Sequence, residues 1–213
     1  MRHAMNGYGL LAVVLGYLLG SLPFGLYIAK WWKGIDVREH GSGNIGATNV
    51  YRVVGAPAGV LVFILDVGKG LAPPAAASAL GLSAVWQVAA GMAAILGHNF
   101  SPFLGFKGGK GVSTSLGVLL GVAWPVGITA WILWAVVVAT TRYVSLGSIL
   151  AAASLAPLSA WYFPLHTPDN LARFAFCFAA GLFSIVKHRS NIVRLLHGTE
   201  NRIGRTGSSR GPD

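Results

Sequence analysis

The sequence predicts an all-α protein, a polytopic membrane bundle of seven transmembrane helices, and three observations carry this prediction. Hydrophobic residues make up 54% of the chain and charged residues only 10%, whereas an average soluble chain has about 45–50% and about 25%. The hydrophobic residues form long runs, and a helix satisfies its own backbone hydrogen bonds where lipid excludes water. The basic residues gather in short segments between these runs, as they do in cytoplasmic loops of membrane proteins.

The hydrophobic runs place the predicted spans in order along the chain. The first is YGLLAVVLGYLLGSLPFGLYIAKWW, which ends at two lysines and two tryptophans, residue types that favour the membrane surface. Because this run is long and lacks a small-residue cleavage site, we expect a retained span and not a removed signal peptide. The other runs cover about 53–73, 82–97, 112–140, 143–164 and 171–186. We expect one integral-membrane domain over 1–205 and a disordered polar tail over 206–213.

Charge decides the predicted orientation. Thirteen of the sixteen Lys and Arg residues lie in the loops near 30–52, 107–110, 142 and 187–210, so these loops are all expected in the cytoplasm. They can share one side only if 112–140 is a hairpin that turns near Pro125. That arrangement gives seven spans, an outside N-terminus and a cytoplasmic C-terminus. Each hairpin arm would have about 14 residues against the usual minimum of about 17, so five spans with this segment re-entrant is the structural alternative.

The first polar loop, REHGSGNIGATNVYR, matches the G-x-G-x-x-G pattern of dinucleotide-binding proteins. That pattern indicates a dinucleotide only inside a soluble βαβ unit, for which the chain leaves no room between its spans. Asp66, at the distance of a ribose ligand, lies three residues before Lys69 and is expected to pair with it. The loop instead supplies hydrogen-bonding side chains at a membrane edge, and the candidates are Ser42, Asn44, Thr48 and Arg52.

The second polar loop, GHNFSPFLGFKGGKGVSTS, has the composition of a phosphate cradle. Successive glycine N–H groups can converge on an anion that lysines neutralise. This predicts a phosphate site made by Lys107, Gly108, Gly109, Lys110 and Gly111. The loop is not a Walker A motif, because counting from Gly105 a lysine, Lys110, stands where the second glycine is required. A glycine-rich turn with two cytoplasmic lysines is the simpler alternative.

The last polar region, VKHRSNIVRLLHGTENRIGRT, follows the final span. His188 and Asn191 are three residues apart and can share a helix face, and Glu200 follows in a turn. Alone, this region is also typical of a basic helix that binds anionic lipid. The short TTRYVSLGS adds Arg142 and Ser145, for which a single interfacial anchor is the alternative. Together, the four loops suit a small phosphate-carrying substrate better than a lipid headgroup.

Other classes of site are disfavoured by the residue inventory. Cys177 is the one cysteine and lies in a hydrophobic run, so we expect a packing residue and no disulfide or cysteine-based metal site. We expect no metal and no cofactor. The net charge of +10 is scattered over membrane loops, so we expect no nucleic acid as a partner.

Five segments resemble the bacterial membrane glycerol-3-phosphate acyltransferases that use acyl-phosphate as donor. They are GSLPFGLYIAK, REHGSGNIGATNVYR, LGHNFSPFLGFKGGKGV, TRYVSLGSI and KHRSNIVRLLHGTENRIG, in order from about residue 20 to 204. The resemblance implies transfer of a fatty acyl group from long-chain acyl-phosphate to the 1-hydroxyl of sn-glycerol 3-phosphate. The products are lysophosphatidic acid and phosphate, in the first step of bacterial phospholipid biosynthesis. It also implies seven helices in the inner membrane among its lipids, a site at the cytoplasmic face, and a soluble enzyme that supplies the acyl-phosphate.

The resemblance also implies residue roles. The first motif gives Ser42 and Arg52, the second gives the glycine nest with its two lysines, and the third gives His188, Asn191 and Glu200. We expect the catalytic set to be Ser42, Arg52, His188 and Asn191. Ser42 is expected to hydrogen-bond and not to form a covalent intermediate, because the donor is already activated. His188 either accepts the proton or orients a substrate, and both roles stay open.

The donor prediction has a second basis. Most acyltransferases that acylate glycerol phosphate from coenzyme A thioesters carry His-x-x-x-x-Asp, and no histidine here has Asp five positions later. With acyl-phosphate, the protein chiefly has to align the reacting groups and neutralise charge. Two other classes compete with the enzyme. A carrier would place its site at the midplane between repeated halves, and we find no repeat; a lipid-binding scaffold would need no glycine nest.

Overall fold

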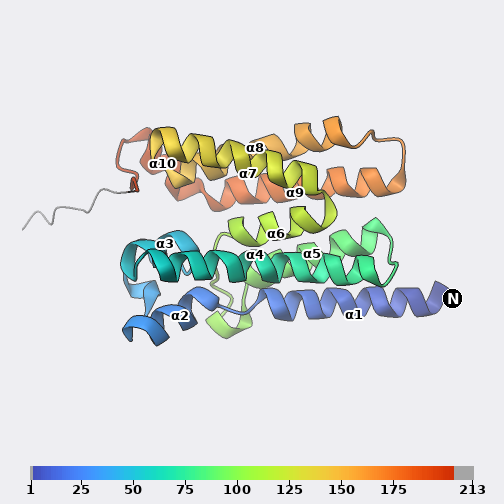
Figure 1. Cartoon of the computed structure of the whole chain (residues 1–213), viewed down its shortest axis with the longest axis horizontal. Helices are drawn as coiled ribbons and strands as arrows, with labels where there is room; N and C mark the ends of the chain where they lie inside the picture. Colours follow the sequence, from blue (N-terminus) through green and yellow to red (C-terminus); the bar gives the residue numbers. More distant parts are fainter. Residues whose placement is uncertain (1, 204–213) are drawn as a thin grey trace, which may run out of the picture.

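The computed structural model describes residues 2–203, which form helices joined by short loops (Figure 1). No strand occurs within this range. The all-α prediction is therefore confirmed for the described residues, and they contain no βαβ unit for a dinucleotide. The predicted tail at 206–213 lies outside the described residues.

Seven helices run along the long axis of the bundle, and successive members run in opposite directions (Figure 1). These seven are α1 (Arg2–Gly20), α4 (Ala56–Ala79), α5 (Ala84–Asn99), α6 (Val112–Val122), α7 (Trp124–Thr141), α8 (Val144–Tyr162) and α9 (Pro168–Lys187). The shorter elements are α2 (Phe24–Lys33), α3 (Ala47–Val53), α10 (Arg189–Leu196) and two 3-10 turns, Val37–Glu39 and Pro102–Leu104. Helix α1 packs on α5, α4 packs on α6, and α8 lies between α7 and α9.

Within residues 2–203, five helical segments have the length and apolar character of membrane spans: Met5–Lys33, Ala56–Ala79, Trp124–Thr141, Val144–Tyr162 and Pro168–Lys187. The predicted hairpin is present and breaks at Ala123, with arms of 11 and 18 residues. At 1.5 Å per residue, the 11 residues of α6 extend about 16 Å, roughly half the bilayer core. Helix α6 therefore begins inside the bundle (Figure 1), and the loop before it reaches inward. The number of full crossings stays a prediction.

The break between α1 and α2 exposes backbone carbonyls within the Met5–Lys33 segment. The Ser101 hydroxyl donates to the Ser21 carbonyl at 2.6 Å, and Lys69 Nζ donates to the Leu22 carbonyl at 2.8 Å. An unpaired polar group in hydrocarbon costs several kcal/mol, so these bonds make the break tolerable. Lys69 also forms the predicted ion pair, with 2.7 Å between its Nζ and Asp66 Oδ1.

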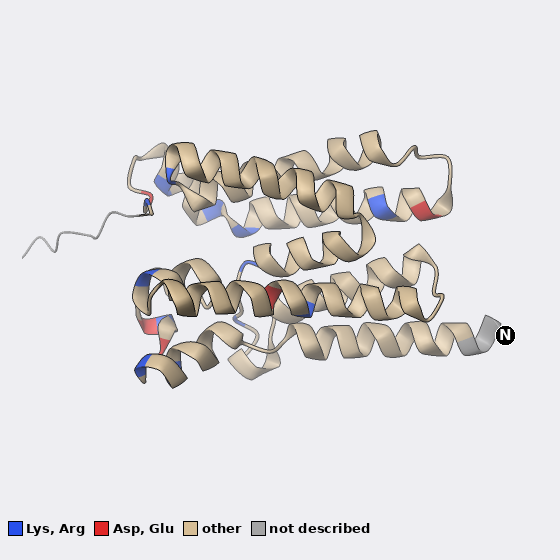
Figure 2. Cartoon of the chain, viewed as in Figure 1, with Lys and Arg blue, Asp and Glu red and all other residues tan. Residues whose placement is uncertain are grey.

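The charged residues are distributed unequally along the bundle. Lys and Arg gather towards the end that holds α2, α3 and α10 (Figure 2). Three of the four polar regions lie at that end (Figure 1). They are the first loop, the turn between α7 and α8 that carries Arg142, and the last polar region after α9. At the other end, Arg173 on α9 donates from Nε to the carbonyl of Val122, the last residue of α6, at 2.9 Å. Three of the four polar regions therefore share one end, as predicted, and the second reaches into the bundle before α6; which side of the membrane that end faces stays a prediction.

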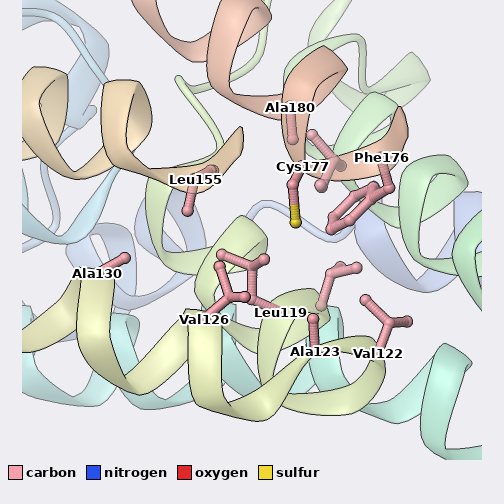
Figure 3. Packing of buried hydrophobic residues seen from close by; sticks show 11 residues of the cluster. Leu119, Val122, Ala123, Val126, Ala130, Leu155, Phe176, Cys177 and Ala180 are labelled. Atoms are coloured by element: carbon pink, nitrogen blue, oxygen red, sulfur yellow. The ribbon is translucent and has the colours of Figure 1, made fainter. Parts of the chain in front are cut away.

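Buried apolar side chains of α6, α7, α8 and α9 form one of the bundle's two core clusters (Figure 3). Cys177 on α9 is fully buried in it, as expected of a packing residue. Leu119, Ala130, Leu155 and Ala180 belong both to this cluster and to the wall of a cavity. The core thus forms the floor of the site described next.

Candidate active site

One cavity of about 390 Å³ gathers residues from all four predicted polar regions. The predicted residues that line it are Ser42, Asn44, Thr48, Arg52, Lys110, Gly111, Ser145, His188, Asn191 and Glu200. Four predicted residues do not line it: Lys107, Gly108, Gly109 and Arg142.

The first loop is held over the cavity by Asn49, a residue not predicted for the site. Its Oδ1 accepts the Ser42 N–H at 2.9 Å, and its Nδ2 donates to the carbonyls of Val37 and His40 at 3.1 and 3.0 Å. Gly41 has φ +62°, and a Cβ there would lie 2.4 Å from Asn49 Oδ1. Glycine at 41 therefore allows the backbone to approach Asn49 closely.

Asn44 starts the short helix that carries two further site residues. Its Oδ1 accepts the Gly46 N–H at 2.8 Å, a turn that asparagine favours, and α3 begins at the next residue. Thr48 and Arg52 are four residues apart on α3, so they share one face, and both line the cavity.

The glycine nest is not formed as predicted. The N–H of Gly108 donates to the Asn99 carbonyl at 3.0 Å, and that of Gly109 donates to the His98 carbonyl at 3.1 Å. These two N–H groups are therefore already bonded and do not converge on an anion. Only Gly111 of the three glycines lines the cavity, with φ +78° directly before α6.

The first turn of α6 provides the backbone donors that the glycines do not. Val112 and Ser113 line the cavity, and within residues 2–203 their N–H groups have no hydrogen-bond acceptor. Free N–H groups and the helix dipole attract anions at a helix N-terminus. Lys110 precedes this turn and lines the cavity, whereas Lys107 is exposed away from it.

Glu200 accepts hydrogen bonds that hold the last polar region together. Its Oε1 accepts the Asn191 amide at 2.7 Å and the Ser145 hydroxyl at 2.9 Å, and its Oε2 pairs with Arg194 Nε at 2.7 Å. The Asn191 Oδ1 in turn accepts from Lys110 Nζ. Side chains of α8 and α10 are thus joined at one carboxylate, and Asn191 links them to Lys110 in the loop before α6.

Arg142 supports the site through its backbone carbonyl, and its side chain does not line the cavity. It ends α7 in a left-handed turn with φ +62°, and its carbonyl accepts the Ile203 N–H at 2.9 Å. This bond ties the segment that carries Glu200 to the α7–α8 turn. The predicted substrate contact from the Arg142 side chain is therefore not supported by the geometry.

His188 lies between α9 and α10 and is 3% exposed. Its Nδ1 is 2.8 Å from the Ser184 carbonyl; since a carbonyl only accepts, Nδ1 carries the proton. Burial lowers the pKa of His188, and the charge of Lys110 lowers it further against the opposing effect of the Ser184 carbonyl and Glu200. The neutral ring therefore has its lone pair on Nε2, as a proton acceptor requires.

The electrostatics of the cavity mouth favour an anion. Arg52, Lys110 and Arg194 line the cavity together with two carboxylates, Glu200 and Asp66. Asp66 is neutralised by its own ion pair with Lys69, so the three cations outnumber the remaining carboxylate, Glu200. Burial lowers the pKa of Lys110 to about 8, with Glu200 opposing and the two arginines adding to the shift. Burial raises the pKa of Glu200, but hydrogen bonds from Asn191, Arg194 and Ser145 outweigh it, so Glu200 stays ionised.

The cavity continues into an apolar arm between α6, α7, α8 and α9. Its lining includes Leu116, Leu119, Ala130, Trp131, Trp134, Ala151, Ala152, Leu155 and Ala180. Small side chains on three of these helices leave room for a long apolar chain beside the basic mouth.

Several cavity residues were not predicted as site residues. Arg194 follows His188 and Asn191 at the same three-residue spacing, so helical periodicity was a usable signal. Asp66 was predicted only as an ion pair, and His98 was not predicted, yet both line the cavity. No cluster of three or more potential metal ligands occurs in the described part of the chain, and the expectation of no metal stays a prediction.

The chain resembles known proteins over nearly its whole length. The sequence model of a family described as glycerol-3-phosphate acyltransferase matches residues 10–198. A glycerol-3-phosphate acyltransferase of Synechococcus sp. is 50% identical over 195 residues, which cover 92% of this chain and 94% of the relative. One of Geobacter sulfurreducens is 47% identical over 194 residues, which cover 91% and 97%.

Two solved structures share the fold. The crystal structure of PlsY (YgiH), an integral membrane glycerol 3-phosphate acyltransferase, in its glycerol 3-phosphate form matches with a TM-score of 0.83 and 43% identity. The lysophosphatidic acid form matches with a TM-score of 0.80 and 42% identity. Each match covers 92% of this chain and 96% of the other.

Proposed function

Because the chain belongs to the glycerol-3-phosphate acyltransferase family, we propose that it transfers a fatty acyl group from acyl-phosphate to the 1-hydroxyl of sn-glycerol 3-phosphate. The products are lysophosphatidic acid and inorganic phosphate. The observation that carries the proposal is a single cavity that joins a mouth with three cations to an apolar arm. The proposed site faces the cytoplasm of a bacterial inner membrane, and a soluble enzyme supplies the acyl-phosphate.

The basic mouth suits the phosphate groups of both substrates. Arg52, Lys110 and Arg194 can form charge-assisted hydrogen bonds to phosphate oxygens, and the first turn of α6 offers free N–H groups beside them. The apolar arm suits the acyl chain. A donor seated with its chain in the arm and its phosphate in the mouth has its reactive carbonyl where the two meet.

Because the donor is already activated, the protein has to align the reacting groups, neutralise charge and accept one proton. The 1-hydroxyl oxygen attacks the acyl carbonyl carbon, the bond from that carbon to the phosphate oxygen breaks, and phosphate leaves. The hydroxyl proton passes to His188 Nε2, which is unprotonated at neutral pH. Ser42 and Asn191 line the cavity and can hydrogen-bond the reacting groups.

The donor is tested with purified protein given glycerol 3-phosphate and either palmitoyl phosphate or palmitoyl coenzyme A. We expect lysophosphatidic acid from palmitoyl phosphate and none above the protein-free control from the thioester. Comparable turnover with the thioester contradicts the donor assignment. A carrier would give a different result: vesicles that contain the protein would take up glycerol 3-phosphate, and no lysophosphatidic acid would form when both substrates are present.

The KM for glycerol 3-phosphate is expected to rise with pH above about pH 8. The Lys110 pKa of about 8 means that its charge is present below this pH and is lost as pH increases through it, while a phosphate monoester with a second pKa of about 6 stays dianionic. In Lys110→Arg, the side chain stays charged, so its KM should be constant from pH 7 to 9. A flat profile for the unaltered protein contradicts this assignment.

The proposed orientation is tested by labelling single cysteines in a Cys177→Ala background. His40, His166 and His197 are all exposed. An impermeant maleimide added outside intact cells should label a cysteine at 166 and neither of the other two, which should react only after the membrane is opened. Outside labelling at position 40 or 197 contradicts a cytoplasmic site.

A further inference from the structure

Three ionisable side chains, Asp66, Lys69 and His98, lie buried in the bundle and have no part in the proposed chemistry. They are 2%, 3% and 4% exposed. Asp66 lies half-way along α4, and His98 is one residue from the end of α5. Ionisable groups inside a membrane protein are costly and mark functional positions.

The three side chains form a chain of contacts through the bundle. Lys69 Nζ bonds the Leu22 carbonyl at the α1–α2 break at 2.8 Å and Asp66 Oδ1 at 2.7 Å. Asp66 Oδ1 is 3.8 Å from His98 Nδ1, a buried atom with no hydrogen-bond partner among the described residues. The negative charge of Asp66 beside this edge of the imidazole attracts an N–H there and so favours this orientation of the ring.

The far side of the His98 ring contacts the loop that carries Lys110. The His98 carbonyl accepts the Gly109 N–H at 3.1 Å. A Cβ added at Gly109 would lie 2.1 Å from His98 Nε2, so the ring rests directly on the glycine backbone. The next residue is Lys110, and α6 begins two positions later.

We infer that His98, oriented by Asp66 and Lys69, is a positioning residue that sets the place of Lys110 and of the first turn of α6. It acts through the backbone of Gly109 and does not touch the substrate. The inference rests on the proposed function, which assigns Lys110 and that turn to the phosphate of glycerol 3-phosphate. The inference also gives a new reason for glycine at position 109, in place of the predicted phosphate nest. A side chain at this position would collide with the imidazole ring of His98.

The test is a double-mutant cycle made of Gly109→Ala, His98→Ala and the variant that carries both substitutions. Gly109→Ala should raise the KM for glycerol 3-phosphate on the order of 10- to 100-fold, the effect of about one hydrogen bond to a charged group. His98→Ala should also raise it, because the loop loses its support. In the His98→Ala background the methyl group has room, so adding Gly109→Ala should change the KM by about threefold or less, since effects of contacting residues are not additive.

Two readouts and one control variant separate positioning from a general structural effect. The KM for acyl-phosphate should change much less than that for glycerol 3-phosphate, and the melting temperature should not follow the KM. Gly68→Ala on α4 is the matched control, because a Cβ there meets nothing within 4 Å; it should leave both KM values unchanged. If His98→Ala does not fold, His98→Asn takes its place in the cycle.

The inference is overturned if Gly109→Ala has the same effect with and without His98, or if His98→Ala raises both KM values equally. Failure of the proposed function gives a different result, in which the unaltered protein makes no lysophosphatidic acid. In that case the same cycle is read by calorimetric titration with inorganic phosphate. Coupling between positions 98 and 109 in phosphate affinity then still supports positioning, and independent effects reject it.

Discussion

Replacing His188 with alanine is expected to lower kcat about 10²- to 10⁴-fold, the range that a positioned general base contributes. The KM for glycerol 3-phosphate should change little, because the phosphate is held by other groups. The expectation rests on the 2.8 Å contact between Nδ1 and the Ser184 carbonyl, which leaves the lone pair on Nε2. Steady-state kinetics on protein that elutes as a folded species provides the measurement.

One variant and one control decide whether His188 accepts the proton or orients a substrate. His188→Gln places an amide near the Nε2 position and can orient a substrate, but it cannot take up a proton; near-normal kcat in this variant would assign an orienting role. His197→Ala is the matched control, because its Nδ1 also contacts a carbonyl four residues earlier, at 2.8 Å, on an exposed surface. That variant should retain full activity.

The helical architecture could be predicted because its causes are local. Long hydrophobic runs and short basic loops determine which segments are helical, and a parity argument on loop charge gave the hairpin that breaks at Ala123. The sequence did not predict that α6 would have only 11 residues. That length depends on where the preceding loop reaches into the bundle, which is decided by contacts between α4, α5 and α6.

The candidate site was predicted where a side chain itself faces the cavity. Ser42, Arg52, His188 and Asn191 all line it. The prediction failed where backbone groups mattered, because the same glycine composition serves an anion nest or a close contact. The carbonyls that bond Gly108 and Gly109 belong to His98 and Asn99, and only the folded chain brings them there.

The same limit explains the residues that were not predicted. Asn49 organises the first loop through bonds to backbone atoms at 37, 40 and 42, and no spacing in the sequence distinguishes it from Asn44. The apolar arm of the cavity has no motif either. Its walls are small residues on separate helices, each of which alone has the composition of ordinary helix packing.

The second large effect is expected from filling that arm. Ala152 on α8 is buried and lines the cavity, whereas its neighbour Ala153 is exposed on the outside of the bundle. Ala152→Phe should lower kcat/KM for a 16-carbon acyl-phosphate roughly 100-fold, because excluding about four methylenes at about 0.8 kcal/mol each removes about 3 kcal/mol of binding. The same substitution should spare a four-carbon donor, whose chain does not reach the added ring.

Activity with the short donor shows that the variant is folded, and Ala153→Phe controls for adding an aromatic ring to α8. Equal losses with both donors would mean that the substitution distorts the mouth, and an unchanged kcat/KM for the long donor would place the acyl chain outside this arm.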